Sequence, residues 1–191
     1  MTFLTDFADQ AVILPLVLAV AGALAAQGWR RGAVVWLCVL FATFATLLSL
    51  KLAFLACSPL FGPMDIRSPS GHVAAASVVS GGLAALLLRR RAPILPIAAM
   101  AALIIGVSRI VLGAHSLPEV AVGALVGLLG ALALLRLAGQ APELRNGRLV
   151  ATVIIIATIF HGLHLPAEAA IRHTAIRASL LLPACHQKEP L

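Results

Sequence analysis

Apolar residues fill six long stretches of the chain, and short polar segments separate them. A helix that crosses a membrane needs roughly 20 apolar residues in a row. Stretches close to that length run over 11–26, 32–57, 72–88, 93–112, 119–135 and 149–165. The tail after Pro166 mixes charged and apolar residues in a weak pattern, which favours a position on the membrane surface. The pattern predicts an all-α integral membrane protein with about six transmembrane helices in one bundle.

Composition supports this fold class. Of the 191 residues, 61% are hydrophobic and 11% are charged, whereas a soluble domain is about 45–50% apolar and about 25% charged. The length allows one domain, so residues 1–191 are expected to form a single membrane domain. The net charge is +7, but only 5% of the residues are aromatic, and the basic residues lie in short loops. We therefore expect the lipid bilayer as a partner and no nucleic acid, while the oligomeric state stays open.

The basic residues are distributed unevenly between the two sides of the predicted bundle. The loops after the first, third and fifth stretches hold eight of the 14 Lys and Arg residues, against one acid, Glu143. These eight are Arg30, Arg31, Arg89, Arg90, Arg91, Arg136, Arg145 and Arg148. The positive-inside rule places that side in the cytoplasm. The other side then faces outward, which predicts the periplasmic face of a bacterial inner membrane.

The three cysteines, Cys38, Cys57 and Cys185, form no metal-binding spacing. Cys38 lies in the middle of a stretch, where a small buried hydrophobic residue is the expected role. Whether Cys57 and Cys185 pair on the outer side is left open by the sequence.

Two short polar segments carry the candidate chemistry. The first, residues 67–72, reads Arg-Ser-Pro-Ser-Gly-His and opens the third stretch. The beginning of a helix attracts anions through its free N–H groups and its dipole. Ser70 adds a hydroxyl donor, and Gly71 allows a ligand to approach the backbone closely. Ser70 as a simple N-cap is the alternative, but it explains neither His72 nor Arg67.

The second segment ends the fourth stretch with Ser108-Arg109 and continues to His115 and Glu119. The guanidinium of Arg109 suits a phosphoryl group, and Lys51 lies on the same side of the membrane. Both cations also fit the alternative of snorkelling to the headgroups. Ser116 and Glu119 fit a capping box, a role that is compatible with Glu119 holding the ring of His115. Together the residues indicate one site that handles phosphate.

These residues resemble the signature of the type 2 phosphatidic acid phosphatase superfamily, in particular its membrane lipid phosphate phosphatase branch. That signature has three blocks, K-x6-R-P, P-S-G-H and S-R-x5-H-x3-D. The second block is complete at residues 69–72, and the third is complete except that Glu119 replaces the aspartate. The first block is partial, because Ser58-Pro59 follows Lys51 and the arginine is missing. We hypothesise that Arg67 takes its place, within site blocks that span residues 51–119.

The resemblance implies a mechanism. His115 is expected to be the nucleophile that forms a phosphohistidine, with one ring N–H held by Glu119. His72 is expected to be the general acid and later the base that activates water. Phosphate binding is assigned to Lys51, Arg67, Ser70, Gly71 and Arg109. No metal and no cofactor is implied, because side chains supply the positive charge.

The resemblance also implies a function, the hydrolysis of a membrane lipid phosphate or pyrophosphate monoester. Phosphatidic acid and a polyprenyl pyrophosphate such as undecaprenyl pyrophosphate are both candidates, and the sequence does not choose between them. A lipid phosphotransferase is chemically adjacent, since the phosphohistidine can pass to an acceptor other than water. A lipid-phosphate binding protein without catalysis is a further alternative, although binding alone needs no pair of histidines.

Overall fold

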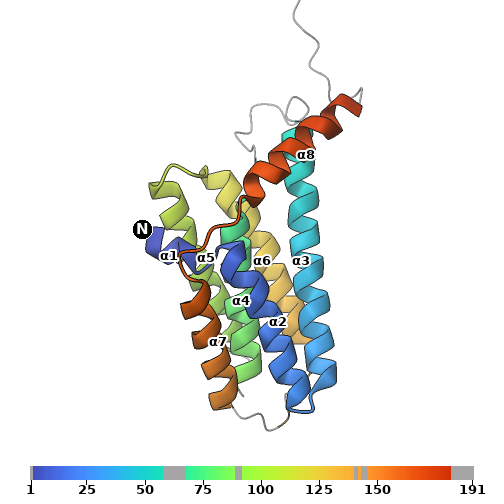
Figure 1. Cartoon of the computed structure of the whole chain (residues 1–191), viewed down its shortest axis with the longest axis vertical. Coiled ribbons are helices and arrows are strands. Elements are labelled where there is room, and N and C mark those ends of the chain that lie inside the picture. Colours follow the sequence, from blue (N-terminus) through green and yellow to red (C-terminus); the bar gives the residue numbers. More distant parts are fainter. Residues whose placement is uncertain (1, 58–67, 89–91, 140–141, 143–145, 182–191) are drawn as a thin grey trace, which may run out of the picture.

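The computed structural model describes residues 2–57, 68–88, 92–139, 142 and 146–181. Over these residues the chain forms eight helices and no strand, so the all-α prediction is confirmed (Figure 1). The helices are α1 (Thr2–Asp6), α2 (Gln10–Ala26), α3 (Arg30–Ala56), α4 (Gly71–Leu87), α5 (Ile94–Val111), α6 (Leu117–Leu137), α7 (Asn146–Phe160) and α8 (Ala167–Leu181).

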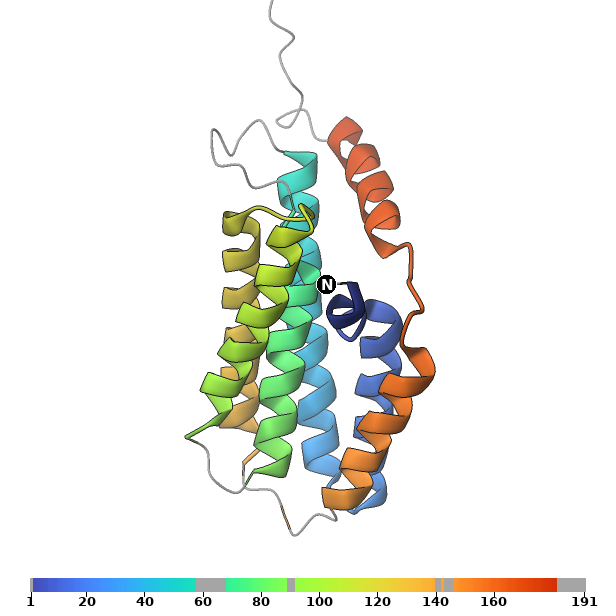
Figure 2. The same cartoon turned by 90° about the vertical axis from the view of Figure 1, so that its left-hand side faces the viewer.

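The long helices run along one axis as a bundle (Figures 1 and 2). α4 packs against α5 and α6, α3 packs against α2 and α6, and α7 packs against α2. Among the described helices, α3, α5 and α6 are long and apolar enough to cross a membrane, whereas α2, α4 and α7 are apolar but shorter. Six transmembrane helices therefore remain a prediction, whereas the three long apolar helices fit a membrane protein.

The interior and the outside of the bundle are both apolar. Trp36 of α3 is fully buried, and its indole Nε1 donates a hydrogen bond to the carbonyl of Val17 on α2 at 3.0 Å. Large apolar side chains also cover the outside, for example Phe41 at 75% and Leu103 at 60% exposed. An apolar exterior of this kind is what a helix bundle presents to lipid.

Glycines bring α6 into close contact with α4. A Cβ atom at Gly123 would overlap the carbonyl oxygen of Ser70, and one at Gly127 would lie 2.6 Å from the carbonyl oxygen of Ala74. This small-xxx-small spacing lets two helix backbones approach each other. The approach fixes the beginning of α4 against the first turns of α6, where the candidate site residues lie.

The structure differs from the prediction in three places. The sixth apolar stretch was expected to continue to Leu165, but α7 ends at Phe160 because Gly162 takes a positive φ of 81°. The short α1 was not predicted; it packs against α5 and lies between the α2–α7 pair and the other helices in Figure 2.

Cys38 is exposed rather than buried, because it lies on the outward face of α3. Cys57 is disulfide-bonded, and Cys185 lies outside the described residues.

Two histidines after α7 hold α1 in position. His161 Nε2 lies 3.2 Å from the carbonyl oxygen of Phe3, and His164 Nε2 lies 3.0 Å from Asp6 Oδ1. The ring of His161 also contacts the rings of Phe3 and Phe7. These contacts connect the segment before α8 to the beginning of the chain, next to the candidate site.

Candidate active site

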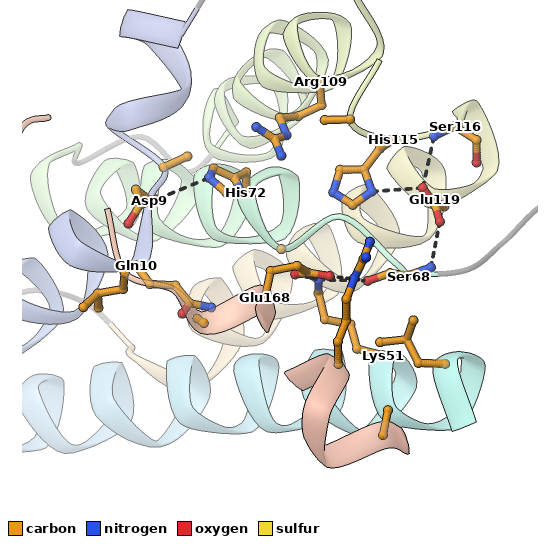
Figure 3. Close-up of a pocket in the computed structure, with 18 of the residues that line it drawn as sticks. Asp9, Gln10, Lys51, Ser68, His72, Arg109, His115, Ser116, Glu119 and Glu168 are labelled. Atoms are coloured by element: carbon orange, nitrogen blue, oxygen red, sulfur yellow. Dashed lines mark hydrogen bonds and ion pairs between the residues drawn. The ribbon is translucent and has the colours of Figure 1, made fainter. Parts of the chain in front are cut away.

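A cavity of about 690 Å³ opens at the end of the bundle where α3 ends and α4 and α6 begin (Figure 3). Its polar lining consists of Asp9, Gln10, Lys51, Ser68, His72, Arg109, His115, Ser116, Glu119, Glu168 and Arg172. The structure therefore brings most of the predicted site residues together, although they lie far apart in sequence. Ser70 is not among the described residues that line the cavity. Arg67 lies outside the described residues.

The turn after α5 positions His115. Gly113 has a φ of 65°, and its N–H donates to the carbonyl of Ile110 at 2.9 Å. The N–H of Ala114 donates to the carbonyl of Arg109 at 3.0 Å. This pair of hydrogen bonds is a Schellman motif, which ends a helix where glycine adopts the left-handed conformation. The turn is short, so His115 is presented directly before the first turn of α6.

Glu119 connects three parts of the site. Its Oε2 lies 2.9 Å from His115 Nδ1 and accepts a hydrogen bond from the N–H of Ser116 at 3.1 Å. Its Oε1 accepts from the N–H of Ser68 at 2.7 Å. The capping box is thus present, and the same carboxylate also holds the histidine ring. The two roles that the sequence suggested for Glu119 occur together.

This arrangement fixes the tautomer of His115. A carboxylate only accepts hydrogen bonds, so His115 Nδ1 carries the proton and Nε2 keeps its lone pair. Burial lowers the pKa of the His115 ring, and the hydrogen bond and charge of Glu119 only partly oppose that shift. The ring is therefore neutral at pH 7. A neutral imidazole with a fixed tautomer is the form that acts as a nucleophile.

The beginning of α4 presents fewer donors to the cavity than the sequence suggested. Ser70 is fully buried, and its N–H already donates to the carbonyl of Glu119 at 3.0 Å. The Ser70 hydroxyl is buried and has no hydrogen-bond partner among the described residues. Because α6 packs so closely here, Ser70 joins α4 to α6 instead of reaching the cavity. Gly71 and His72, at the first turn of the helix, do line it.

Lys51 is 4% exposed, and its ammonium group is already paired. Its Nζ donates to Ser68 Oγ at 3.0 Å and lies 2.6 Å from Glu168 Oε2. The other oxygen of Glu168 accepts from the Ser68 hydroxyl at 3.1 Å. A carboxylate from α8 thus already accepts hydrogen bonds from two donors of the cavity lining. An anion that binds Lys51 must share that ammonium with Glu168 or displace it.

Glu168 is ionised in this position. Burial alone would raise the pKa of its carboxyl, but the hydrogen bond and charge of Lys51, aided by the Ser68 hydroxyl, outweigh burial and lower it. The side chain is 49% exposed, so solvent screens the pair on one side.

Arg109 and His72 form the other side of the cavity (Figure 3). The Nε of Arg109 is buried and has no hydrogen-bond partner among the described residues. His72 Nε2 lies 3.7 Å from Asp9 Oδ2. The cavity therefore contains two histidines, each facing a carboxylate, together with the cations Lys51 and Arg109.

Sequence reasoning missed Asp9, Glu168 and the contacts of Ser68. Ser68 lies within residues 67–72, the first polar segment, and that position is the signal that could have identified it. Asp9 precedes an apolar stretch as an N-cap, which gave no reason to link it to His72. Glu168 lies 117 residues after Lys51 on a segment with a weak pattern. No local pattern predicts that approach.

Within the described part of the chain, no group of three or more His, Cys, Asp or Glu side chains is arranged to hold a metal ion. The family model for the PAP2 superfamily matches residues 54–143, a range that includes the P-S-G-H block and the block that ends at Glu119. The search of curated proteins and the search of solved structures each found no match.

Proposed function

We propose that this chain, which belongs to the PAP2 superfamily, is a membrane phosphatase that hydrolyses a lipid phosphate or pyrophosphate monoester through a phosphohistidine. Membership of the superfamily indicates phosphatase-type activity on phosphate esters. One observation carries the finer proposal. His115, with its proton held on Nδ1 by Glu119, lines one cavity with a second histidine and two buried or partly buried cations.

In the first step, His115 Nε2 attacks phosphorus while the bond between phosphorus and the ester oxygen breaks. The leaving oxygen takes a proton from the ring of His72, so an alcohol departs. The phosphorylated His115 ring still carries its Nδ1 proton and is therefore cationic. Glu119 stabilises that cation through the hydrogen bond it already makes, at 2.9 Å.

In the second step, water attacks the phosphohistidine and gives its proton to His72, which is now neutral. Phosphate leaves, His115 regains its lone pair and His72 is again protonated. Lys51, Arg109 and the N–H of Gly71 stabilise the charge on the transferring phosphoryl group. This assignment uses side chains and backbone for every cationic or donor role. Arg67 remains a predicted phosphate ligand and lies outside the described residues. Ser70 contributes by joining α4 to α6.

The position of the site favours a lipid substrate. The cavity lies at the end of an apolar bundle, where a headgroup can enter while its acyl chains stay in the bilayer. Leu55, Leu165 and Ile176 add apolar surface to the lining beside the polar residues. A substrate with both a phosphate and an apolar part matches this lining.

The same geometry supports a site on the outer side of a bacterial inner membrane. Arg30 begins α3, whereas Lys51 lies near the other end of that helix. Arg136 likewise lies at the end of α6 that is remote from Glu119. The positive-inside rule assigns the arginine end to the cytoplasm and the cavity to the periplasm. The 17 residues of α4 span about 26 Å, close to the roughly 30 Å of a hydrocarbon core, which is compatible with six spans in one domain.

Phosphate release by the purified full chain in detergent, with a chelator present, tests this proposal. The substrates are dioctanoyl phosphatidic acid and a polyprenyl pyrophosphate. The variants are His115→Ala and, as a matched control, His173→Ala, which removes an exposed histidine of α8 that does not line the cavity. We expect release by the wild type and by H173A, and none by H115A.

Equal release by wild type and H115A would contradict the phosphohistidine. No release by the wild type from either lipid would overturn hydrolysis. Transfer of phosphate from the same lipids to an added alcohol would then identify a phosphotransferase. Binding of these lipids without turnover or transfer would identify a lipid-phosphate binding protein.

A further inference from the structure

Asp9 approaches the cavity from the beginning of α2. It is 7% exposed, and its Oδ1 accepts a hydrogen bond from the N–H of Ala11 at 2.8 Å, so it caps the helix. Its other oxygen, Oδ2, faces His72 Nε2 at 3.7 Å (Figure 3). Capping uses one oxygen only. The second oxygen points toward a ring that a helix cap does not need.

Among the described residues, the other charged or titratable groups that face His72 are two cations and a second histidine. Arg109 approaches from α5, Lys51 from α3, and His115 from the turn between α5 and α6. Arg109 and Lys51 repel a protonated His72 ring, whereas Asp9 attracts it. His72 is the residue that must carry a proton before the ester bond breaks. A carboxylate directed at its ring is therefore placed where the first step needs one.

We infer that Asp9 is a positioning residue for the general acid, holding the His72 Nε2–H so that the Nδ1–H faces the leaving oxygen. This inference rests on the proposed function. When the bond between phosphorus and the ester oxygen breaks, the Nδ1 proton moves to that oxygen and the ring becomes neutral. Its Nε2–H remains directed at Asp9. In the second step the proton that water loses returns to Nδ1, so His72 is restored with no other reactant.

The pair resembles the other carboxylate–histidine pair in the cavity, but it has a different task. Glu119 holds His115 as a neutral ring with a free lone pair, whereas Asp9 favours the charged ring of His72. Asp9 is contributed by the segment between α1 and α2, before the range that the family model matches. The amino-terminal segment thus supplies part of the acid–base chemistry, beyond its packing against the bundle.

Asp9→Asn separates this role from capping, because asparagine is as good an N-cap as aspartate and removes only the charge. The matched control is Asp6→Asn, which neutralises a nearby aspartate that contacts His164 and does not line the cavity. A thermal unfolding scan of each variant in detergent verifies that folding is unchanged. Asp9→Ser, which also keeps a capping oxygen, serves as a second variant without the carboxylate.

The readout is kcat/KM for two phosphate monoesters with different leaving groups. Dioctanoyl phosphatidic acid releases an alkoxide, which needs the proton of His72, whereas 4-nitrophenyl phosphate releases a phenolate that is stable without it. For D9N and D9S we expect kcat/KM to fall about tenfold or more on the lipid and less than about twofold on the aryl ester. The control D6N is expected to match the wild type on both. In the His72→Ala background, D9N is expected to cause no further loss on the lipid.

An equal loss on the two esters, or no loss on the lipid, would overturn the role of Asp9 while leaving the phosphatase proposal intact. A further tenfold loss when D9N is added to H72A would also overturn it, since Asp9 would then act apart from His72. If the wild type hydrolyses neither ester, the proposed function fails and this inference fails with it.

Discussion

Replacing Glu168 by glutamine is expected to strengthen phosphate binding. Glu168 Oε2 lies 2.6 Å from Lys51 Nζ, and Glu168 Oε1 accepts from the Ser68 hydroxyl at 3.1 Å. A phosphate that uses Lys51 competes with this carboxylate. Glutamine keeps the size of the side chain and one acceptor oxygen but removes the negative charge. In E168Q, a weaker contact with Lys51 is then broken when an anion binds.

The magnitude follows from the exposure of the pair. The side chain of Lys51 is 5% exposed, but that of Glu168 is 49% exposed, so solvent screens the interaction. Half-exposed ion pairs contribute about 0.2–1 kcal/mol. If the incoming phosphate displaces Glu168 completely, removing that competition improves its affinity by roughly 1.4- to 5-fold. We expect the inhibition constant of inorganic phosphate and the KM for dioctanoyl phosphatidic acid to fall by this factor, with kcat unchanged.

The assay measures phosphate-ester hydrolysis in detergent at increasing concentrations of inorganic phosphate. Thr174→Ala is the matched control, because it changes an exposed residue on the same helix that does not line the cavity. A KM that rises in E168Q would show instead that Glu168 holds Lys51 in place for the substrate. An unchanged KM and inhibition constant would refute the competition between Glu168 and phosphate.

The contact between Glu168 and Lys51 also predicts a dependence of stability on pH. The folded pKa of Glu168 is lowered below its ordinary value of 4.5, so the pair stabilises the fold above that pH. The stabilisation is lost as the pH falls through the folded pKa. We expect wild type to unfold at a higher temperature than E168Q at pH 7, and the difference to shrink as the pH falls below about 4.5. A difference that stays constant to pH 3 would contradict this.

Three further predictions concern the packing of α6 and the pair formed by His115 and Glu119. Gly123→Ala is expected to destabilise the protein by about 1–3 kcal/mol, because the new Cβ meets the Ser70 carbonyl. In the control Gly22→Ala the new Cβ meets nothing within 4 Å, so the unfolding temperature is expected to stay the same or rise. Glu119→Gln is expected to lower kcat about 10- to 100-fold, since the His115 ring loses its charged partner; full activity would leave Glu119 with capping alone. Because burial lowers the pKa of His115, the acid limb of kcat/KM that reports its protonation is expected to have a midpoint below pH 6.5, and a midpoint above that value would contradict a buried neutral ring.

The sequence predicted most of the helical framework, because long apolar stretches leave helices as the way to satisfy the backbone in a membrane. It missed α1, which is too short to give a periodic pattern, and it extended α7 past Gly162 because the segment 161–165 is only weakly polar. The apolar count also did not distinguish inward from outward positions. The burial predicted for Cys38 was wrong for that reason, because apolar residues on the outward and inward faces of a helix look alike in the sequence.

The candidate site was partly predictable. His72, Arg109, His115 and Glu119 fall into local segments with fixed spacing, so the sequence grouped them, and the structure brings them to one cavity. Ser70 was expected to face a ligand, but the absence of a side chain at Gly123 lets α6 approach and bury it. No local sequence pattern predicts the charged residues that other segments contribute to the site, because their positions depend on how the helices pack. Asp9 and Glu168 are the two examples, and both alter the electrostatics of the site.

Trapping the phosphorylated enzyme tests the proposed phosphohistidine most directly. Wild type and His115→Ala are mixed with dioctanoyl phosphatidic acid that carries radioactive phosphate, in the presence of chelator, and quenched after a few turnovers. We expect label bound covalently to the wild type, stable to alkali and released by acid as expected of a phosphohistidine, and no label on H115A. Turnover by the wild type with no bound label at any quench time, or equal label on H115A, would contradict it.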